Sequence, residues 1–132
     1  MLMAGSKHKY LVEIVGTFIL VYAIASAATV YSDSGLLGVI GIGLVHALAL
    51  TAIVYAIGYR FGAEVNPAVT IGMLVARKLG VREAVLYILS HIVGAVIGAA
   101  IVYATISINI LIIRSLFTVI YYILIKKDVY LS

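Results

Sequence analysis

The chain has no cysteine, no tryptophan and one proline, and charged residues make up only 11% of its 132 residues. Without cysteine it can have no disulfide framework, thiolate chemistry or cysteine-ligated metal. A soluble domain carries about 25% charged residues. Because 65% of this chain is hydrophobic, a water-soluble fold of this length could not bury its apolar surface. The composition therefore predicts an integral membrane protein.

Long apolar segments predict an all-α membrane fold. A transmembrane helix needs about 20 mainly apolar residues, and the segments 10–30, 36–57 and 84–103 satisfy this requirement. Residues 1–9 read as a short cytoplasmic tail. Residues 106–132 form a hydrophobic tail that is a candidate fourth span. The composition of this tail is atypical, because all 12 glycines of the chain lie at or before Gly98.

Between the second and third of these segments lies an apolar stretch of only half a span. Asn66 is a preferred N-cap residue and Pro67 suits the first helical position, so a helix should begin here. It should end near Ala76, because Arg77 and Lys78 suit the negative end of a helix dipole. About eleven residues rise roughly 16 Å, about half the thickness of the hydrocarbon core. Such a helix cannot cross a bilayer.

We therefore predict a re-entrant loop and half-helix within residues 58–76, entering from the cytoplasmic side and beginning near the midplane. Irregular backbone at that depth must be buried in protein or line a wet cavity. The helix N-terminus would present free N–H donors and partial positive charge, which disfavours cations and protons. Asn66, Pro67 and Ala68 are the candidate pore-lining residues. The alternative is an Asn-Pro turn that begins an ordinary surface helix.

The basic residues predict the orientation of the chain. If the N-terminus is cytoplasmic, the basic residues beside the hydrophobic segments share that side, and Asp33 lies outside. This one-sided distribution satisfies the positive-inside rule. The residues are Lys7, Lys9, Arg60, Arg77, Lys78 and Arg82, joined by Lys126 and Lys127 if the tail crosses, with Arg114 as the exception. We expect a multi-pass protein of the cell membrane.

Three motifs together resemble the major intrinsic protein (aquaporin) family. One resembles its first signature: Gly62-Ala63-Glu64-Val65-Asn66-Pro67-Ala68-Val69-Thr70. Residues 13–18 resemble its first-helix motif, and residues 77–78 with 87–94 resemble its third-helix entry. The likeness covers about residues 10–103, so residues 10–105 would form the first repeat. It implies six spans with two half-helices, passive transport of water or small neutral solutes, no enzymatic activity and no cofactor.

The resemblance also implies roles for two polar residues within spans. Glu13 should face protein, since a carboxylate in hydrocarbon is costly, and the likeness implies that it braces the re-entrant loop. Alternatively, it lies near enough to the interface to reach water. His46 matches a pore-lining position of the family's selectivity filter, although a packing histidine is the alternative. Residues 46–50 are similar to plant tonoplast intrinsic proteins, which suggests other small neutral solutes. No constellation for catalysis or metal binding is visible.

The chain departs from the family in having a single proline, Pro67, and so no second Asn-Pro-Ala motif. We expect a truncated or split channel in the lipid bilayer. Its partner would be a separately encoded second half, or further copies of the chain in a homotetramer. Alone, the chain should conduct poorly. One alternative is a small four-span proton-coupled transporter using Glu13. The half-span after Asn66 argues against it. The other alternative is a non-functional remnant.

Overall fold

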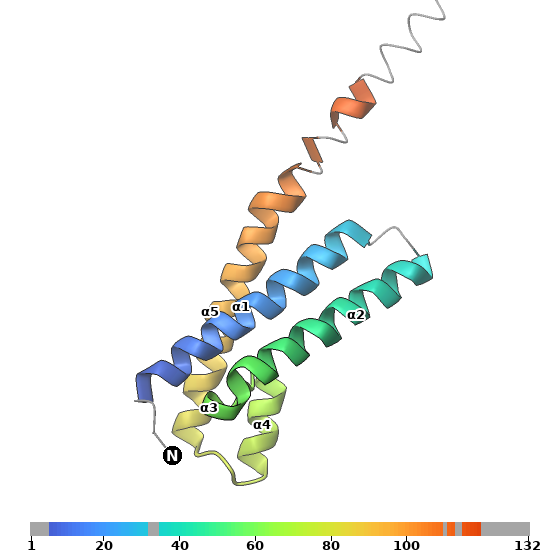
Figure 1. Cartoon of the computed structure of the whole chain (residues 1–132). Coiled ribbons are helices and arrows are strands. Elements are labelled where there is room, and N and C mark those ends of the chain that lie inside the picture. The colour runs from blue at the N-terminus through green and yellow to red at the C-terminus, as the bar shows by residue number, and fades with distance from the viewer. Residues whose placement is uncertain (1–5, 32–34, 110, 113–114, 120–132) are drawn as a thin grey trace, which may run out of the picture.

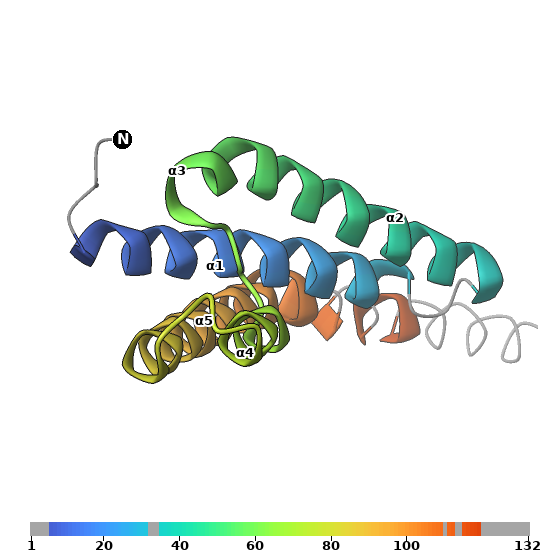
Figure 2. The same ribbon diagram turned by 90° about the horizontal axis from the view of Figure 1, so that it is seen from below.

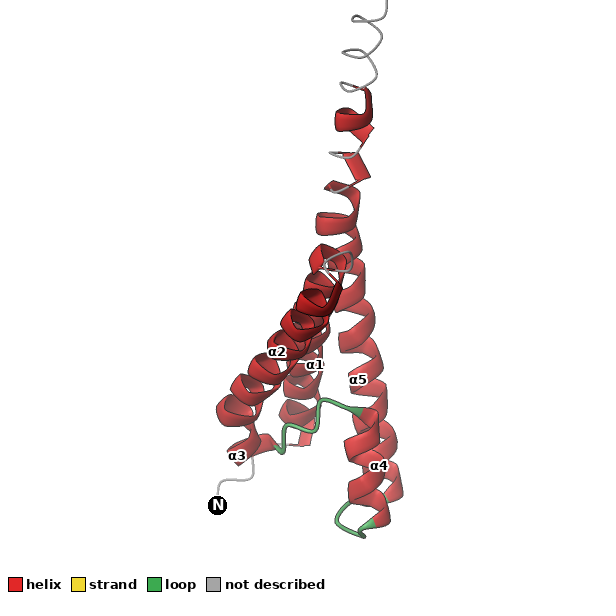
Figure 3. Cartoon of the chain, turned by 90° about the vertical axis from the view of Figure 1, so that its right-hand side faces the viewer, coloured by secondary structure: helices red, strands yellow, loops and turns green. Residues whose placement is uncertain are grey.

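The structure is a computed structural model, and it describes residues 6–31, 35–109, 111–112 and 115–119. These residues contain helices, turns and one loop but no strand (Figure 3). Three helical stretches are long and apolar enough to cross a membrane: His8–Tyr31, Gly38–Phe61 and Val81–Ile106. This confirms the predicted all-α membrane fold. The elements are α1 (Ser6–Tyr31), α2 (Gly35–Ile53), the π-helical turn η1 (Val54–Gly58), α3 (Tyr59–Phe61), α4 (Pro67–Val75), α5 (Val81–Val102) and the π-helical turn η2 (Tyr103–Ser107).

Helix α1 is the central element of the bundle. It packs against α2 on one side and against α5 on the other, while α4 packs against α5 (Figures 1 and 2). The helices α1 and α2 run antiparallel, and the end of α1 and the start of α2 lie far from the start of α1. The loop before α4 passes between the end of α3 and α5, as Figure 3 shows. The half-helix therefore lies against α5, the helix that also packs on α1.

Two glycines allow α1 and α5 to approach closely. A Cβ added to Gly94 would overlap the backbone carbonyl oxygen of Ile14, and one added to Gly98 would lie 3.0 Å from the carbonyl oxygen of Phe18. Gly94 and Gly98 thus form the small-residue pair that lets helix backbones meet in a membrane. This contact fixes how α5 lies against α1, and so where α5 holds the half-helix.

The second span is longer than the sequence predicted. Residue 58 was the expected start of the loop, but the helix continues through η1 and α3 to Phe61. Gly58 keeps helical dihedral angles, whereas Gly62 has a φ of 102° and ends the helix. Residues 62–66 alone therefore form the loop. It is a strained loop, because Ala63 and Val65 have positive φ angles of 49° and 37°.

The third span also extends beyond its predicted end. From Tyr103 the chain stays helical through η2 to Asn109, and residues 111–112 and 115–119 are helical as well (Figure 1). No glycine or proline follows Gly98, so nothing in the described part interrupts the helix where the tail was expected to separate from the third span. The rest of the candidate fourth span, with Arg114, Lys126 and Lys127, lies outside the described residues, as do Asp33 and residues 1–5.

A re-entrant loop and half-helix as candidate functional site

The half-helix α4 begins with a well-formed cap at Asn66. The backbone of Asn66 is extended, and its side-chain Oδ1 accepts a hydrogen bond from the backbone N–H of Ala68 at 2.8 Å. Pro67 occupies the first helical turn, where its missing N–H is no loss. The carbonyl oxygen of Asn66 accepts from the N–H groups of Val69 and Thr70 at 3.1 and 3.2 Å. Within the described residues, the side-chain nitrogen of Asn66 donates to no protein group.

The half-helix ends after nine residues, which rise only about 14 Å. The N–H of Ala76 bonds to the carbonyl oxygen of Gly72, and the N–H of Lys78 bonds to that of Met73, both at 2.9 Å. Arg77 takes a positive φ of 56° and turns the chain toward α5. Because α4 spans less than half of a hydrocarbon core of about 30 Å, it cannot cross a membrane. The predicted helix from Asn66 to about Ala76 agrees with these bounds.

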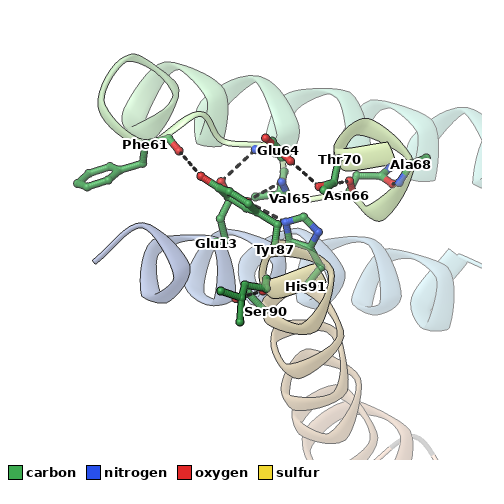
Figure 4. Close-up of polar contacts among 11 residues, drawn as sticks. Glu13, Phe61, Glu64, Val65, Asn66, Ala68, Thr70, Tyr87, Ser90 and His91 are labelled. Carbon is green, nitrogen blue, oxygen red and sulfur yellow. Dashed lines mark hydrogen bonds and ion pairs between the residues drawn. The ribbon is translucent and has the colours of Figure 1, made fainter. Parts of the chain in front are cut away.

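A buried carboxylate connects the loop to two helices. Glu13 of α1 is 0% exposed, and its Oε1 accepts from the N–H of Glu64 at 3.1 Å while its Oε2 accepts from the N–H of Val65 at 2.7 Å (Figure 4). The same Oε2 lies 3.0 Å from Nε2 of His91 on α5. The side chain therefore joins α1, the loop and α5 at one point. The hydrogen bonds satisfy two loop N–H groups that have no place in a helix.

A second carboxylate connects the loop to the half-helix. Glu64 is 8% exposed, and its Oε2 accepts from the hydroxyl of the fully buried Thr70 at 2.5 Å. Tyr87 of α5 donates its hydroxyl to the carbonyl oxygen of Phe61 at 3.4 Å. The loop also packs directly on α1, since a Cβ on Gly16 would come within 2.7 Å of the Val65 side chain. Both ends of the loop are thus held by polar contacts, as Figure 4 shows.

The structure brings some of the sequence-predicted residues together. Asn66, Pro67 and Ala68 form the exposed first turn of α4, and Glu13 contacts the loop that precedes them. His46 is exposed on α2, and within the described ranges no hydrogen bond or ring contact joins it to Asn66. Its place in a pore therefore stays a prediction. No group of three or more His, Asp or Glu side chains in the described part could hold a metal ion.

Two polar residues proved more central than the sequence indicated. His91 and Glu64 were not among the candidate site residues that the sequence indicated. Both are buried and belong to the polar network around Glu13. The available signal was their position, since polar side chains at membrane depth need polar partners.

Helices long enough to span a bilayer, with a half-helix whose N-terminal end is held against the bundle, define a membrane protein with a re-entrant element. The family model described as major intrinsic protein matches residues 3–123. The chain belongs to this family. The match continues past Tyr103, where the resemblance was expected to end, and covers much of the tail.

Named relatives support the same assignment. The chain is 41% identical to glycerol uptake facilitator protein-like 6 of Lactiplantibacillus plantarum over 100 residues, covering 76% of this chain and 44% of that protein. It is 34% identical to aquaporin Z of Rhodopseudomonas palustris over 101 residues, covering 74% and 42%. It is 36% identical to aquaporin AqpM of Methanothermobacter marburgensis over 115 residues, covering 74% and 47%. The chain thus matches less than half the length of these relatives.

Proposed function

We propose that this chain forms one wall of a transmembrane channel for the passive passage of water or small neutral solutes. The observation that carries the proposal is the half-helix α4, too short to cross, with its capped N-terminus held at the bundle by Glu13. The names of the relatives, aquaporins and a glycerol uptake facilitator, support the same class of solute.

The first turn of α4 has the chemistry that such a path needs. The Asn66 side chain uses its oxygen to cap the helix, which leaves its N–H groups free to donate to a passing oxygen atom. The N-terminus of a helix carries a partial positive charge, which favours neutral molecules over cations. Pro67, Ala68 and Val69 are exposed beside it and offer an apolar surface without competing hydrogen bonds. One polar contact on an apolar wall suits water or a small alcohol.

The opposite wall of the path would come from another polypeptide segment. The exposed face of α4 includes Ile71 and Val75, at 50% and 76% exposure, and no described element covers it. A second half-channel, or another copy of the chain, would supply the missing wall. Lipid would cover the outer faces of α2 and α5.

The alternative of a proton-coupled transporter is less compatible with the geometry of Glu13. A proton-carrying carboxylate must alternate between bound and accessible states, whereas Glu13 is fully buried and each oxygen accepts from a loop N–H. Releasing it would leave two buried backbone donors unpaired. The same hydrogen bonds favour a structural role in bracing the loop.

Single cysteines test for a water-filled path, because the chain contains none of its own. In vesicles containing the reconstituted Ala68→Cys variant, a small water-soluble thiol reagent should modify the protein. The matched control is Leu48→Cys, since Leu48 is 68% exposed on α2 and would face lipid. We expect the Ala68→Cys variant to react at least about tenfold faster, because a thiol in hydrocarbon does not ionise to the reactive thiolate. Equal rates for the two variants would contradict the proposal.

A further inference from the structure

Glu64 places a second carboxylate at the start of the half-helix. It lies two residues before the N-cap, is 8% exposed, and accepts a hydrogen bond from Thr70 in the first turn of α4. The Thr70 hydroxyl also lies 3.4 Å from the carbonyl oxygen of Asn66. The carboxylate is therefore fixed against the end of the helix and cannot turn away to solvent while this contact holds.

The groups around Glu64 do not neutralise it. From α1, Glu13 faces the same loop, but its own charge is shared among two N–H groups and His91 of α5. Tyr87 of α5 donates to Phe61 rather than to Glu64. Among the described residues, Lys9 pairs with Glu83 and His91 contacts Glu13, so no basic side chain there pairs with Glu64. Among the described residues, the partner that its carboxylate has is the Thr70 hydroxyl in the first turn of α4.

The effect of Glu64 on the potential at the N-terminus of α4 depends on how the charge of the carboxylate compares with that of the helix end. The N-terminus of a helix is equivalent to roughly +0.5 of an elementary charge. An ionised carboxylate carries a full negative charge, and here it is bonded to the first turn. Because the two charges are opposite in sign, an ionised Glu64 offsets the potential of that end.

We infer that Glu64 determines charge selectivity at this site by offsetting the positive end of α4 beside Asn66. This inference rests on the proposed channel function and deepens it. With Glu64 ionised, the first turn of α4 repels cations less than a bare helix end would. Selection for neutral solutes at this point then depends on the free N–H groups of Asn66 and on the rest of the path, more than on the helix dipole.

The local potential can be measured without solute transport. In the reconstituted Ala68→Cys variant, rates of modification by negatively and positively charged methanethiosulfonate reagents are compared as a ratio. Adding Glu64→Gln removes the charge but keeps an oxygen that can accept from Thr70. We expect the ratio of negative to positive reagent rates to rise at least about threefold, since removing one nearby charge acts on the two reagents with opposite sign. Glu64→Ala, as a second neutral variant, should shift the ratio in the same direction.

Glu83→Gln is the matched control, because Glu83 lies in the first turn of α5 and pairs with Lys9 away from α4. It should leave the ratio unchanged. An unchanged ratio in the neutral Glu64 variants, with Ala68→Cys still reactive, would overturn this inference and leave the channel proposal standing. Failure of both reagents to modify the Ala68→Cys variant at all would overturn the channel proposal and this inference with it.

Discussion

At the scale of single residues, Glu13 decides whether the loop can exist. Residues 62–66 include two non-glycine residues with positive φ angles, Ala63 and Val65, each of which costs on the order of 1–3 kcal/mol. A chain would relax from such a conformation unless its surroundings hold it. Glu13 does so by accepting from two consecutive loop N–H groups while it also lies against His91.

Replacing Glu13 by Gln should therefore destabilise the protein. The amide keeps one acceptor oxygen but turns its NH₂ group toward a loop N–H, which leaves a buried donor unpaired. We expect the free energy of unfolding to fall by about 2 kcal/mol. The measurement is thermal or denaturant unfolding in detergent micelles, followed by circular dichroism. Glu83→Gln, which breaks the partly exposed pair with Lys9, should cost less than about 1 kcal/mol. Equal losses would show that Glu13 does not brace the loop.

The sequence could predict which polar residues within the spans need hydrogen-bond partners, but it could not identify all of those partners. A carboxylate inside an apolar span must face protein, so the orientation of Glu13 was predictable. The contact of Glu64 with Thr70 was not, because it joins residues six positions apart across a bend that begins at Gly62. His91 lies 78 positions from Glu13, and only the packing of α5 on α1 brings the two together.

At the scale of elements, local sequence signals predict the bounds of the half-helix better than the bounds of the loop before it. The N-cap at Asn66, the following proline and the basic pair after Ala76 are all local, and α4 begins and ends within one residue of the prediction. The loop was predicted to begin at Gly58, which the helix instead accommodates in a π-helical turn. Two glycines lie four positions apart there, and sequence alone does not say which one takes the positive φ.

The crossing of α1 and α5 should be sensitive to one added methyl group. In Gly94→Ala the new Cβ overlaps the carbonyl oxygen of Ile14, so the two helix backbones must separate. Overpacking of this kind costs about 1–3 kcal/mol, and because α5 carries His91, the shift should also weaken its contact with Glu13. Unfolding in detergent micelles measures the loss of stability.

The control for this substitution is Gly41→Ala on α2, where a new Cβ meets nothing within 4 Å. Alanine favours a helix by about 1 kcal/mol over glycine, so this variant should be unchanged or slightly more stable. If Gly94→Ala behaved like Gly41→Ala, the close approach of α1 and α5 would not contribute to stability.

At the scale of the whole molecule, the basic residues gather at one end. The start of α1, the end of α3 and the turn between α4 and α5 lie together in Figure 1, far from the end of α1 and the start of α2. This end carries Arg60, Arg77, Lys78 and Arg82, and Lys9 is tied there to Glu83. The fold thus collects on one side charges that are spread along the sequence, and the positive-inside rule predicts that this side is cytoplasmic.

Two single cysteines at opposite ends test this orientation without altering any charge. Gly80 is exposed in the turn before α5, and Tyr31 is exposed at the end of α1. In intact cells, a membrane-impermeant thiol reagent should modify Tyr31→Cys and spare Gly80→Cys, and permeabilisation should make Gly80→Cys reactive. The reason is energetic: the opposite orientation would place four exposed basic side chains outside, against the bias that orients membrane proteins during insertion. Modification of Gly80→Cys in intact cells would mean that α4 enters from outside, with its N-terminal end facing the cytoplasm.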